Sequence, residues 1–174
     1  MPPVIRRATA ADAEALSALA DRLFVQTFVE ELAIPYPPAD LVHYLRHSNG
    51  VDSMEQRLAD PMMAVWLAEA DGVAVGYAVA GPAKMPHPDL KPSDGMLNRL
   101  YVERDRKGAG LAPRLMDLAM AWLVERFGPR PWLSVYSGNL RAQRFYVRYG
   151  FEKCGEHDDP VGTWIDREFI MRRR

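Results

Sequence analysis

The stretch from residue 96 to residue 127 constrains the fold of this 174-residue chain more than any other. Residues 96–102 carry a strand pattern, and residues 109–127 repeat apolar side chains at helical spacing, with Pro113 in the first turn, where proline is tolerated. A charged turn that contains Gly108 and Gly110 joins the two. A strand that leads straight into a helix predicts a sheet covered by helices, which is the α/β class.

The remaining segments extend this pattern into one mixed α/β sheet, and the chain length suits one domain. Residues 63–80 contain two strands that turn at Asp71 and Gly72, a strong hairpin signal. Residues 81–94 hold four prolines and are expected to form a loop, a candidate lip of the substrate site. Further strands are predicted at residues 4–9, 132–136, 151–157 and 163–171, and further helices at residues 10–28, 40–47 and 140–149, with a short one that opens with Asp52 and Glu55.

The charge balance limits the possible partners. Lys and Arg total 22 against 23 Asp and Glu, so the net charge of −1 gives no general attraction to nucleic acid or to an anionic membrane. The sequence has no run of 18 apolar residues, so no membrane span is predicted. Its start lacks the apolar run of a signal peptide, so a cytoplasmic protein is expected.

The residues that most often bind metals show no metal-ligand pattern. The single cysteine, Cys154, follows residues 151–153 in an alternating strand and is predicted to be a small packing residue. Four histidines are scattered without metal-ligand spacing, so no metal site is predicted: His43, His47, His87 and His157.

Residues 107–112 have the composition of an anion-binding loop. The small residues Gly108, Gly110 and Ala112 let the backbone approach a ligand, and the free amides of a helix start favour a di-anion such as a pyrophosphate. A tight turn would use the same residues. The P-loop pattern is absent, and a dinucleotide-binding fingerprint needs a small residue where Pro113 stands.

The same loop resembles motif A of the GNAT superfamily of N-acyltransferases, Arg/Gln-x-x-Gly-x-Gly/Ala, with Lys107 in the first position. The resemblance implies a GNAT-like fold, a mixed and mostly antiparallel central sheet flanked by helices in a single domain over residues 1–174. It also implies acetyl-CoA as co-substrate, with its pyrophosphate on the loop amides and its pantetheine arm paired with residues 100–102. The implied cofactor-binding residues here are Leu100, Tyr101, Val102, Lys107, Gly108, Ala109, Gly110, Leu111 and Ala112.

Residues 139–151 resemble motif B of the same superfamily, Asn-x-x-Ala-x-x-Phe-Tyr-x-x-x-Gly-Phe, at every named position. Asn139, Ala142 and Tyr146 lie at i, i+3 and i+7, so a helix would place them on one face. Asn139 suits a helix N-cap and can also face the cofactor, for which Ala142 leaves room. A tyrosine can protonate the departing thiolate near neutral pH, and the resemblance assigns that role to Tyr146; stacking in the core beside Phe145 is the alternative for this residue.

Acyl transfer from a thioester to an amine needs a base that removes a proton from the amine, and this sequence has no carboxylate at the position where the superfamily usually carries one. Many relatives carry a glutamate where this sequence has Asn98. We predict Asn98, with Tyr146, to be a catalytic-site residue, although an amide cannot accept the proton of the amine. A water chain to solvent, or a substitute acid such as Glu103 or Asp94, would fill the gap. The alternative is a catalytically weak module that senses acyl-CoA.

Short N-terminal matches resemble the PaiA-type polyamine acetyltransferases, at residues 27–31 and 38–45. They suggest a small-molecule primary amine as acceptor, with a polyamine as one option. Carboxylates near the cleft would suit a cationic acceptor, so Glu30 and Glu31 are candidate substrate-binding residues, although a solvated acidic face explains them equally well. The protein is expected to act as a monomer or a homodimer, without nucleic acid or membrane.

Overall fold

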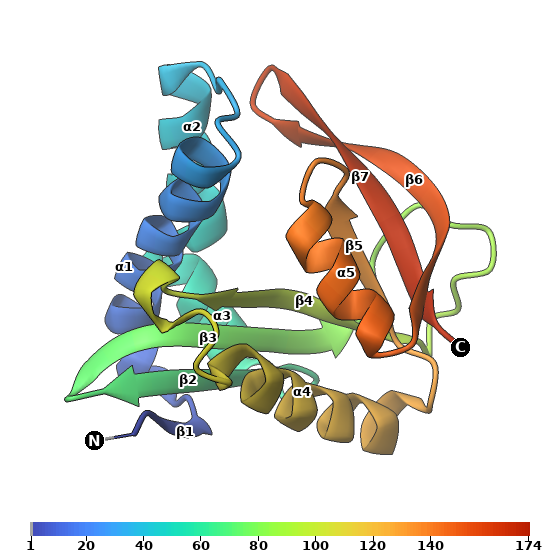
Figure 1. Cartoon of the computed structure of the whole chain (residues 1–174), viewed down its shortest axis with the longest axis horizontal. Coiled ribbons are helices and arrows are strands. Elements are labelled where there is room, and N and C mark those ends of the chain that lie inside the picture. The colour runs from blue at the N-terminus through green and yellow to red at the C-terminus, as the bar shows by residue number, and fades with distance from the viewer. Residues whose placement is uncertain (1) are drawn as a thin grey trace.

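A single twisted sheet forms the centre of the molecule, with helices on both faces (Figure 1). The computed structural model describes residues 2–174, and within them the sheet has seven strands in the order β1-β2-β3-β4-β5-β7-β6. The strands are β1 (Val4–Arg7), β2 (Ala64–Ala70), β3 (Val73–Pro82), β4 (Gly95–Val102), β5 (Trp132–Tyr136), β6 (Phe151–Val161) and β7 (Trp164–Arg173). Every pairing is antiparallel except that of β4 with β5, which confirms the predicted mixed, mostly antiparallel α/β fold.

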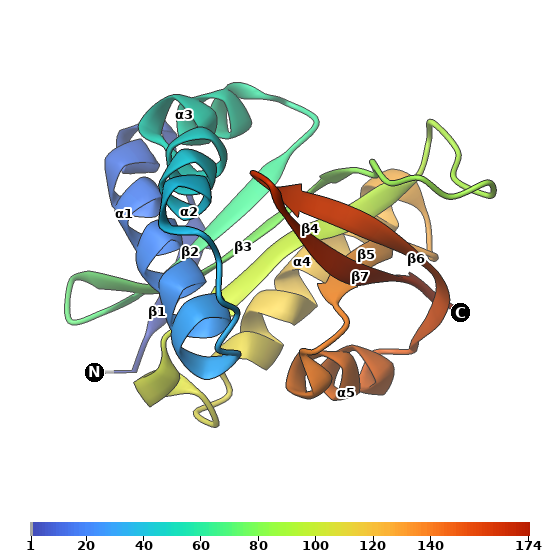
Figure 2. The same cartoon turned by 90° about the horizontal axis from the view of Figure 1, so that it is seen from above.

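Helices surround this sheet in two groups (Figure 2). The α-helices are α1 (Ala13–Phe24), α2 (Pro38–Tyr44), α3 (Val51–Ala59), α4 (Leu111–Phe127) and α5 (Leu140–Arg148). Helix α4 packs on one face through Leu115, Ala119 and Leu123, and α1 packs on the other through Leu16, Leu19 and Leu23. These residues recur at spacings of four in α4 and of three and four in α1, which gives each helix the apolar stripe that it needs to cover a sheet.

Strands β4 and β5 separate shortly after they meet. They pair in parallel at Met96 with Trp132 and at Leu97 with Leu133. The register of β4 against β3 then shifts, because Arg99 pairs with Val79 and Leu97 pairs with Ala80, which leaves Asn98 as the extra residue of a β-bulge. A bulge bends its strand and increases the local twist, so β4 turns away from β5 and a fork opens between them.

The bulge also corrects one expectation. Strict alternation places Met96, Asn98, Leu100 and Val102 on one face of the strand. With one extra residue in the strand, Leu97 instead joins Leu100 and Val102 in the core beneath α4, and Met96 packs in a separate cluster with Trp132 and Ile170. A bulge of this kind has no sequence signal that simple alternation can detect.

Several boundaries differ from the predicted ones. Helix α1 continues as a π-helix, η2 (Val25–Glu31), and α2 continues as a second π-helix, η3 (Leu45–Asn49), so the helical pattern runs further than predicted. Helix α4 begins at Leu111 rather than at Ala109, because Gly110 takes the left-handed conformation of the residue before the helix. Strand β6 extends to Val161.

Two further predictions, for the loop after β3 and for Cys154 within β6, are wrong. The loop at residues 83–94 does not form a lip of the cleft described below, since Met85 and Leu90 pack against Trp132, whose indole N–H donates to Asp94 at 2.9 Å. Cys154 is exposed rather than packed, because it is the extra residue at a register shift between β6 and β7. Partial burial of the thiol raises its pKa, and a raised pKa does not favour a nucleophile.

Candidate active site

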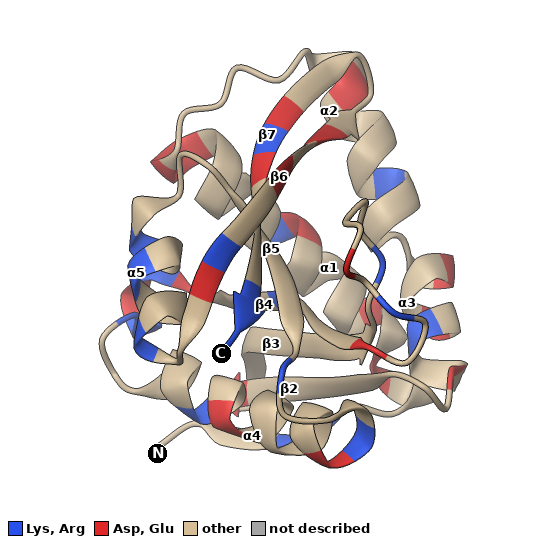
Figure 3. Cartoon of the chain, turned by 90° about the vertical axis from the view of Figure 1, so that its right-hand side faces the viewer, with Lys and Arg blue, Asp and Glu red and all other residues tan. Residues whose placement is uncertain are grey.

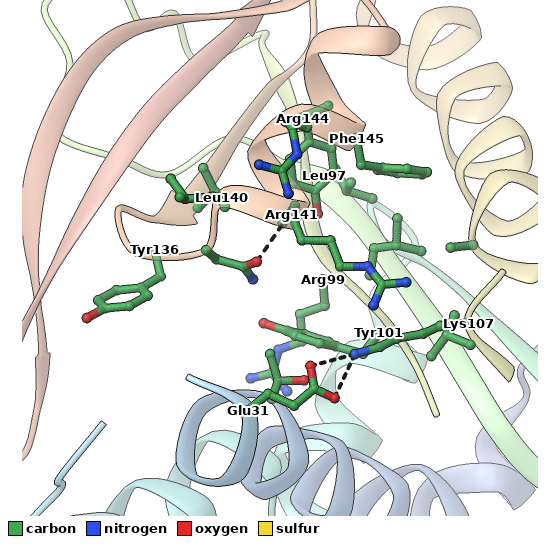
Figure 4. Close-up of a pocket in the computed structure, with 18 of the residues that line it drawn as sticks. Glu31, Leu97, Arg99, Tyr101, Lys107, Tyr136, Leu140, Arg141, Arg144 and Phe145 are labelled. Atoms are coloured by element: carbon green, nitrogen blue, oxygen red, sulfur yellow. Dashed lines mark hydrogen bonds and ion pairs between the residues drawn. The ribbon is translucent and has the colours of Figure 1, made fainter. Parts of the chain in front are cut away.

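A cleft of about 750 Å³ occupies the fork between β4 and β5. Its walls are the open edge of β4, helix α5, the π-helix η2 and the loop that precedes α4 (Figure 4). Strands β4 and β5 close it at the end where Leu97 pairs with Leu133. The cleft therefore has two different ends, a loop end near residues 107–112 and a closed end at the fork.

The loop end presents free backbone amides. The amide N–H groups of Lys107 and Ala109 donate back to the carbonyls of Arg104 and Arg106, at 3.1 and 3.4 Å. In the described part of the chain, no acceptor faces the amides of Gly108, Gly110, Leu111 and Ala112. Together with the positive end of the helix dipole, these amides form a site that fits a di-anion.

Two glycines make this loop conformation accessible. Gly108 has φ +87° and Gly110 has φ +77°, in the left-handed region where a side chain is strained, and an added Cβ at either would face open space. Both glycines line the cleft. The backbone can therefore face a ligand directly at these two positions.

Charged side chains cross the mouth of the loop end. The Lys107 ammonium contacts both Glu31 carboxylate oxygens, at 2.7 and 2.8 Å (Figure 4). Arg104 pairs with Glu30 at 2.7 Å and with Glu31 at 3.2 Å. These partners lower the pKa of Glu31, although its burial works in the opposite direction. The two candidate substrate-binding carboxylates are thus engaged with the loop's own cations; Glu31 lines the cleft and Glu30 does not, and their role toward an acceptor stays a prediction.

The open edge of β4 forms the floor of the cleft. Asn98 is exposed at the fork, and Leu100, Tyr101 and Val102 line the cleft beyond it. No strand pairs with this edge within residues 2–174 once β5 has left it at Leu133. A free edge can accept an extended, amide-containing chain as an added strand.

Helix α5 places the predicted motif residues against the cleft. Asn139 is the N-cap of α5, as expected from its type, since its side-chain oxygen accepts the amide N–H of Ala142 at 3.1 Å. Ala142 and Tyr146 follow one and two turns later and line the cleft with it. The helix therefore brings the three together as the predicted spacing requires.

Tyr146 has both the environment of a core residue and access to the cleft. Its ring packs edge-on against Phe145 and Phe151, at centroid distances of 5.5 and 6.2 Å. Burial raises its pKa, so the phenol stays protonated across the physiological pH range. None of the residues 2–174 engages its hydroxyl in a hydrogen bond, so the proton is available to a group in the cleft.

A second polar group lies at the closed end of the cleft. Ser134 follows Leu133, the last residue of β5 that pairs with β4, and so lies across the fork from Asn98. Its hydroxyl donates to the Glu168 carboxylate, and it is 2.8 Å from the ring nitrogen Nε2 of His157. Ser134 and Glu168 line the cleft.

Sequence reasoning missed this group because its members come from three strands, β5, β6 and β7, and only the register of those strands brings them together. The two substitute acids that the sequence suggested lie elsewhere. Glu103 is paired with Arg22 at 2.7 Å, Asp94 binds Trp132, and neither lines the cleft.

Phenols and carboxylates outside the cleft lining lie near Glu168. Tyr44 lies near enough to Arg99, Asp159 and Glu168 for their charges to act on its pKa, which is raised mainly by burial. Tyr36 donates to the buried Asp166 carboxylate at 2.5 Å. Aromatic rings beside carboxylates are a favourable setting for an organic cation.

Three arginines of α5 were also missed. Arg141, Arg144 and Arg148 line the cleft, and Figure 4 shows Arg141 and Arg144 beside Phe145 on the wall that α5 forms. Acidic residues recur along β6 and β7 while α5 carries basic ones (Figure 3). The three arginines have the same i, i+3, i+7 spacing as the motif positions, each two residues further along the chain, and this spacing is a signal that could have identified them.

Two other features are absent from the described part of the chain. Among residues 2–174 no cluster of three or more His, Cys, Asp or Glu side chains could hold a metal ion. In the same part of the chain, no helix has the length and apolar character that crossing a membrane requires.

Comparisons with known proteins agree with this geometry. A model of the acetyltransferase (GNAT) family matches residues 25–151. An uncharacterized N-acetyltransferase of Mycobacterium tuberculosis is 30% identical over 166 residues, which cover 93% of this chain and 97% of that protein. A spermine/spermidine N(1)-acetyltransferase of Bacillus subtilis is 30% identical over 89 residues, 51% of this chain and 59% of that protein.

The fold has close matches among solved structures. The PaiA N-acetyltransferase of Thermoplasma acidophilum, crystallised with coenzyme A, aligns with a TM-score of 0.76 at 18% identity, over 100% of this chain and 99% of that one. The family model covers the π-helix, the loop and α5 in one match. The chain belongs to the GNAT family of acetyltransferases and is an acyl-CoA-dependent enzyme of that family.

Proposed function

We propose that this protein transfers the acetyl group of acetyl-CoA to a primary amine of a small molecule, by direct attack within a ternary complex. The observation that carries the proposal is a single cleft with an anion-binding loop at one end and Tyr146 on the wall of the other. An acyl donor with a phosphate-bearing tail fits such a cleft, with its phosphates at the loop and its acyl group near Tyr146.

The free amides of the loop end supply a site for the CoA pyrophosphate. Of the predicted amides of residues 107–112, four have no acceptor, those of Gly108, Gly110, Leu111 and Ala112. The remaining two already donate to carbonyls of the preceding turn. Basic side chains of α5 add positive charge beside the same cleft. Chemical fit of this kind supports acetyl-CoA as co-substrate.

The open edge of β4 offers a path for the pantetheine arm. Residues 98–102 form an extended segment of about 16 Å that leads from the loop end to the fork. The amides of the arm would pair with Leu100, Tyr101 and Val102 as an added strand, and Ala142 leaves room beside Asn139. This orientation puts the thioester near the fork, between Asn98 and Tyr146.

The transfer step has three chemical requirements. The amine must be neutral to attack, the transient oxyanion needs hydrogen-bond donors, and the departing thiolate needs a proton. Tyr146 supplies the proton, since burial keeps it protonated. Asn98 offers an amide N–H₂ at the fork, so its contribution is to orient groups by hydrogen bonding rather than to accept a proton.

The acceptor is a cationic amine, and a polyamine is the leading candidate. The partial similarity to a spermine/spermidine N(1)-acetyltransferase supports this choice. So does the Glu168 carboxylate in the cleft, whose neighbours include Asp159, Asp166 and Tyr44. We further propose that the enzyme works in the cytoplasm, as a monomer or homodimer, on a small molecule.

The test is release of free CoA thiol from acetyl-CoA with a panel of amines that includes spermine, spermidine and monoamines. We expect turnover with at least one primary amine and a higher kcat/KM for polyamines than for neutral alcohols or amides of similar size. Binding of acetyl-CoA without turnover on any amine would contradict the proposal and favour an acyl-CoA sensor.

A further inference from the structure

The closed end of the cleft contains a carboxylate that the reaction, as described so far, does not use. Of the described residues that line the cleft, two are acidic, Glu31 and Glu168. Glu31 is at the loop end, in ion pairs with Lys107 and Arg104. Glu168 is at the fork and has no basic Lys or Arg partner within the described chain.

The position of Glu168 relates directly to the bulge at Asn98. Leu97 and Leu133 are the last paired residues of β4 and β5, so Asn98 and Ser134 face each other where the strands part. Glu168 lies opposite Tyr136 on the neighbouring strand, and the Ser134 hydroxyl donates to it. The chain thus has a carboxylate across β5 from Asn98, the amide at the fork.

The neighbours of Glu168 favour a base rather than a permanent charge. Burial raises the pKa of its carboxyl, and the nearby carboxylates Asp159 and Asp166 raise it further, whereas Ser134 and His157 act in the opposite direction. From β6, the His157 ring nitrogen Nε2 lies 3.6 Å from the carboxylate. A carboxylate whose pKa is displaced toward neutrality is well matched to remove a proton from an amine near pH 7.

We propose that Glu168 is the general base that takes the proton from the acceptor ammonium, directly or through one water, with Ser134 and His157 as positioning residues. This inference rests on the proposed function of the cleft. It replaces the base that Asn98 cannot provide, and it names a residue on β7 for that role.

The proton balance of the reaction closes with this assignment. Glu168 takes one proton from the ammonium, and the neutral nitrogen then forms its bond to the thioester carbonyl carbon. The carbon–sulfur bond breaks, and the thiolate receives a proton from Tyr146. The attacking nitrogen, which becomes acidic as it bonds, gives its second proton to restore Tyr146 by way of water. One proton remains on Glu168 and returns to solvent, so the net release per turnover is one proton.

The test compares Glu168→Gln with the wild type over pH 6–10, following thiol release at saturating acetyl-CoA. We expect kcat/KM for the amine to fall roughly 100-fold or more near neutral pH. The deficit should shrink toward pH 10, because free amines with a pKa of about 10.4 then lose the proton unaided. A deficit equal at every pH would assign Glu168 a structural or binding role and overturn the proposal.

Two further variants make the result specific. Ser134→Ala removes the hydrogen bond that lowers the pKa of Glu168, so the rising limb of the pH profile should move to higher pH while turnover remains. Glu156→Gln is the matched control, an exposed glutamate on β6 that pairs with Lys153, and should leave the profile unchanged. An unmoved profile in Ser134→Ala together with wild-type activity in Glu168→Gln would reject the inference.

The failure of this inference differs from failure of the proposed function. If the wild-type protein releases no thiol with any amine, the proposed function has failed. If the wild type is active and Glu168→Gln is equally active, with unchanged CoA binding and melting temperature, only the general-base assignment has failed.

Discussion

The two ends of the cleft are built in opposite ways. At the loop end, the ligand-facing groups are backbone amides and exposed basic side chains from one continuous segment and α5. At the fork, beside the exposed Asn98 of β4, they are half-buried side chains from β5, β6 and β7, held by hydrogen bonds between strands. We therefore propose that one end supplies anion affinity and the other supplies proton transfer.

This difference means that binding and turnover should separate under mutation. Changes in the loop alter the approach of an anion to the backbone and should act on CoA affinity. Changes at the fork alter groups that act on the reacting atoms and should act on kcat. Variants at each end test whether CoA affinity and kcat respond separately.

The loop end gives the largest expected effect. Gly110→Val puts a β-branched side chain at φ +77° on the wall of the cleft, so CoA affinity should fall at least about 100-fold, or roughly 2.7 kcal/mol. Isothermal titration with CoA measures this loss. Gly72→Val is the matched control, since Gly72 also has φ +77° and open space around its Cβ but lies in the β2–β3 turn.

The control separates strain from binding. Both variants should lose a similar amount of melting temperature, because backbone strain at a positive φ is the same in the two turns. Only Gly110→Val should lose CoA affinity. Equal CoA affinity in the two variants would remove the loop from the account.

Tyr146→Phe tests the fork in the same comparison. Removal of the phenol proton should lower kcat roughly 100-fold while the dissociation constant for CoA changes less than about twofold. Tyr149→Phe is the control, because Tyr149 does not line the cleft and its hydroxyl donates to Asp117 at 3.2 Å and to the Pro113 carbonyl at 3.3 Å. A loss of CoA affinity in Tyr146→Phe that equals its loss of kcat would show that the tyrosine only supports binding.

Glu31→Gln gives the smallest effect and decides between two roles. Loss of its negative charge frees Lys107 for the pyrophosphate, so CoA should bind about two- to fivefold more tightly, as expected for an exposed ion pair. The KM of the amine should stay the same. A raised amine KM with unchanged CoA affinity would instead confirm the expectation that Glu31 binds the acceptor. Glu30→Gln, whose partner is Arg104 outside the cleft, is the control.

The predictability of the site from sequence follows the same division. The loop and α5 are local: residues 107–112 and 139–146 carry their chemistry in short spacings, which fixed turn and helix geometry converts into position. Ser134, His157 and Glu168 meet only through the register of three strands. Sequence spacing gives no access to that register, and a one-residue bulge such as the one at Asn98 changes which side chains share a face.

The fold shows a similar limit. Element types were predicted well wherever the apolar period was long, as in α4 and in the β2–β3 hairpin. The π-helices after α1 and α2 were not expected, because their residues continue a helical pattern and differ only in backbone hydrogen bonding. The prolines of residues 81–94 indicated a loop correctly but not its packing against Trp132.

The most direct test of the two-ended cleft is a crystal structure with a bisubstrate analogue in which the CoA sulfur is joined through an acetyl linker to spermidine. We expect the pyrophosphate on the amides of Gly108 and Gly110, the sulfur beside the Tyr146 hydroxyl, and the linked nitrogen between Asn98 and Glu168. A pyrophosphate bound away from this loop, or a polyamine chain that leaves the fork without approaching Glu168, would contradict the account.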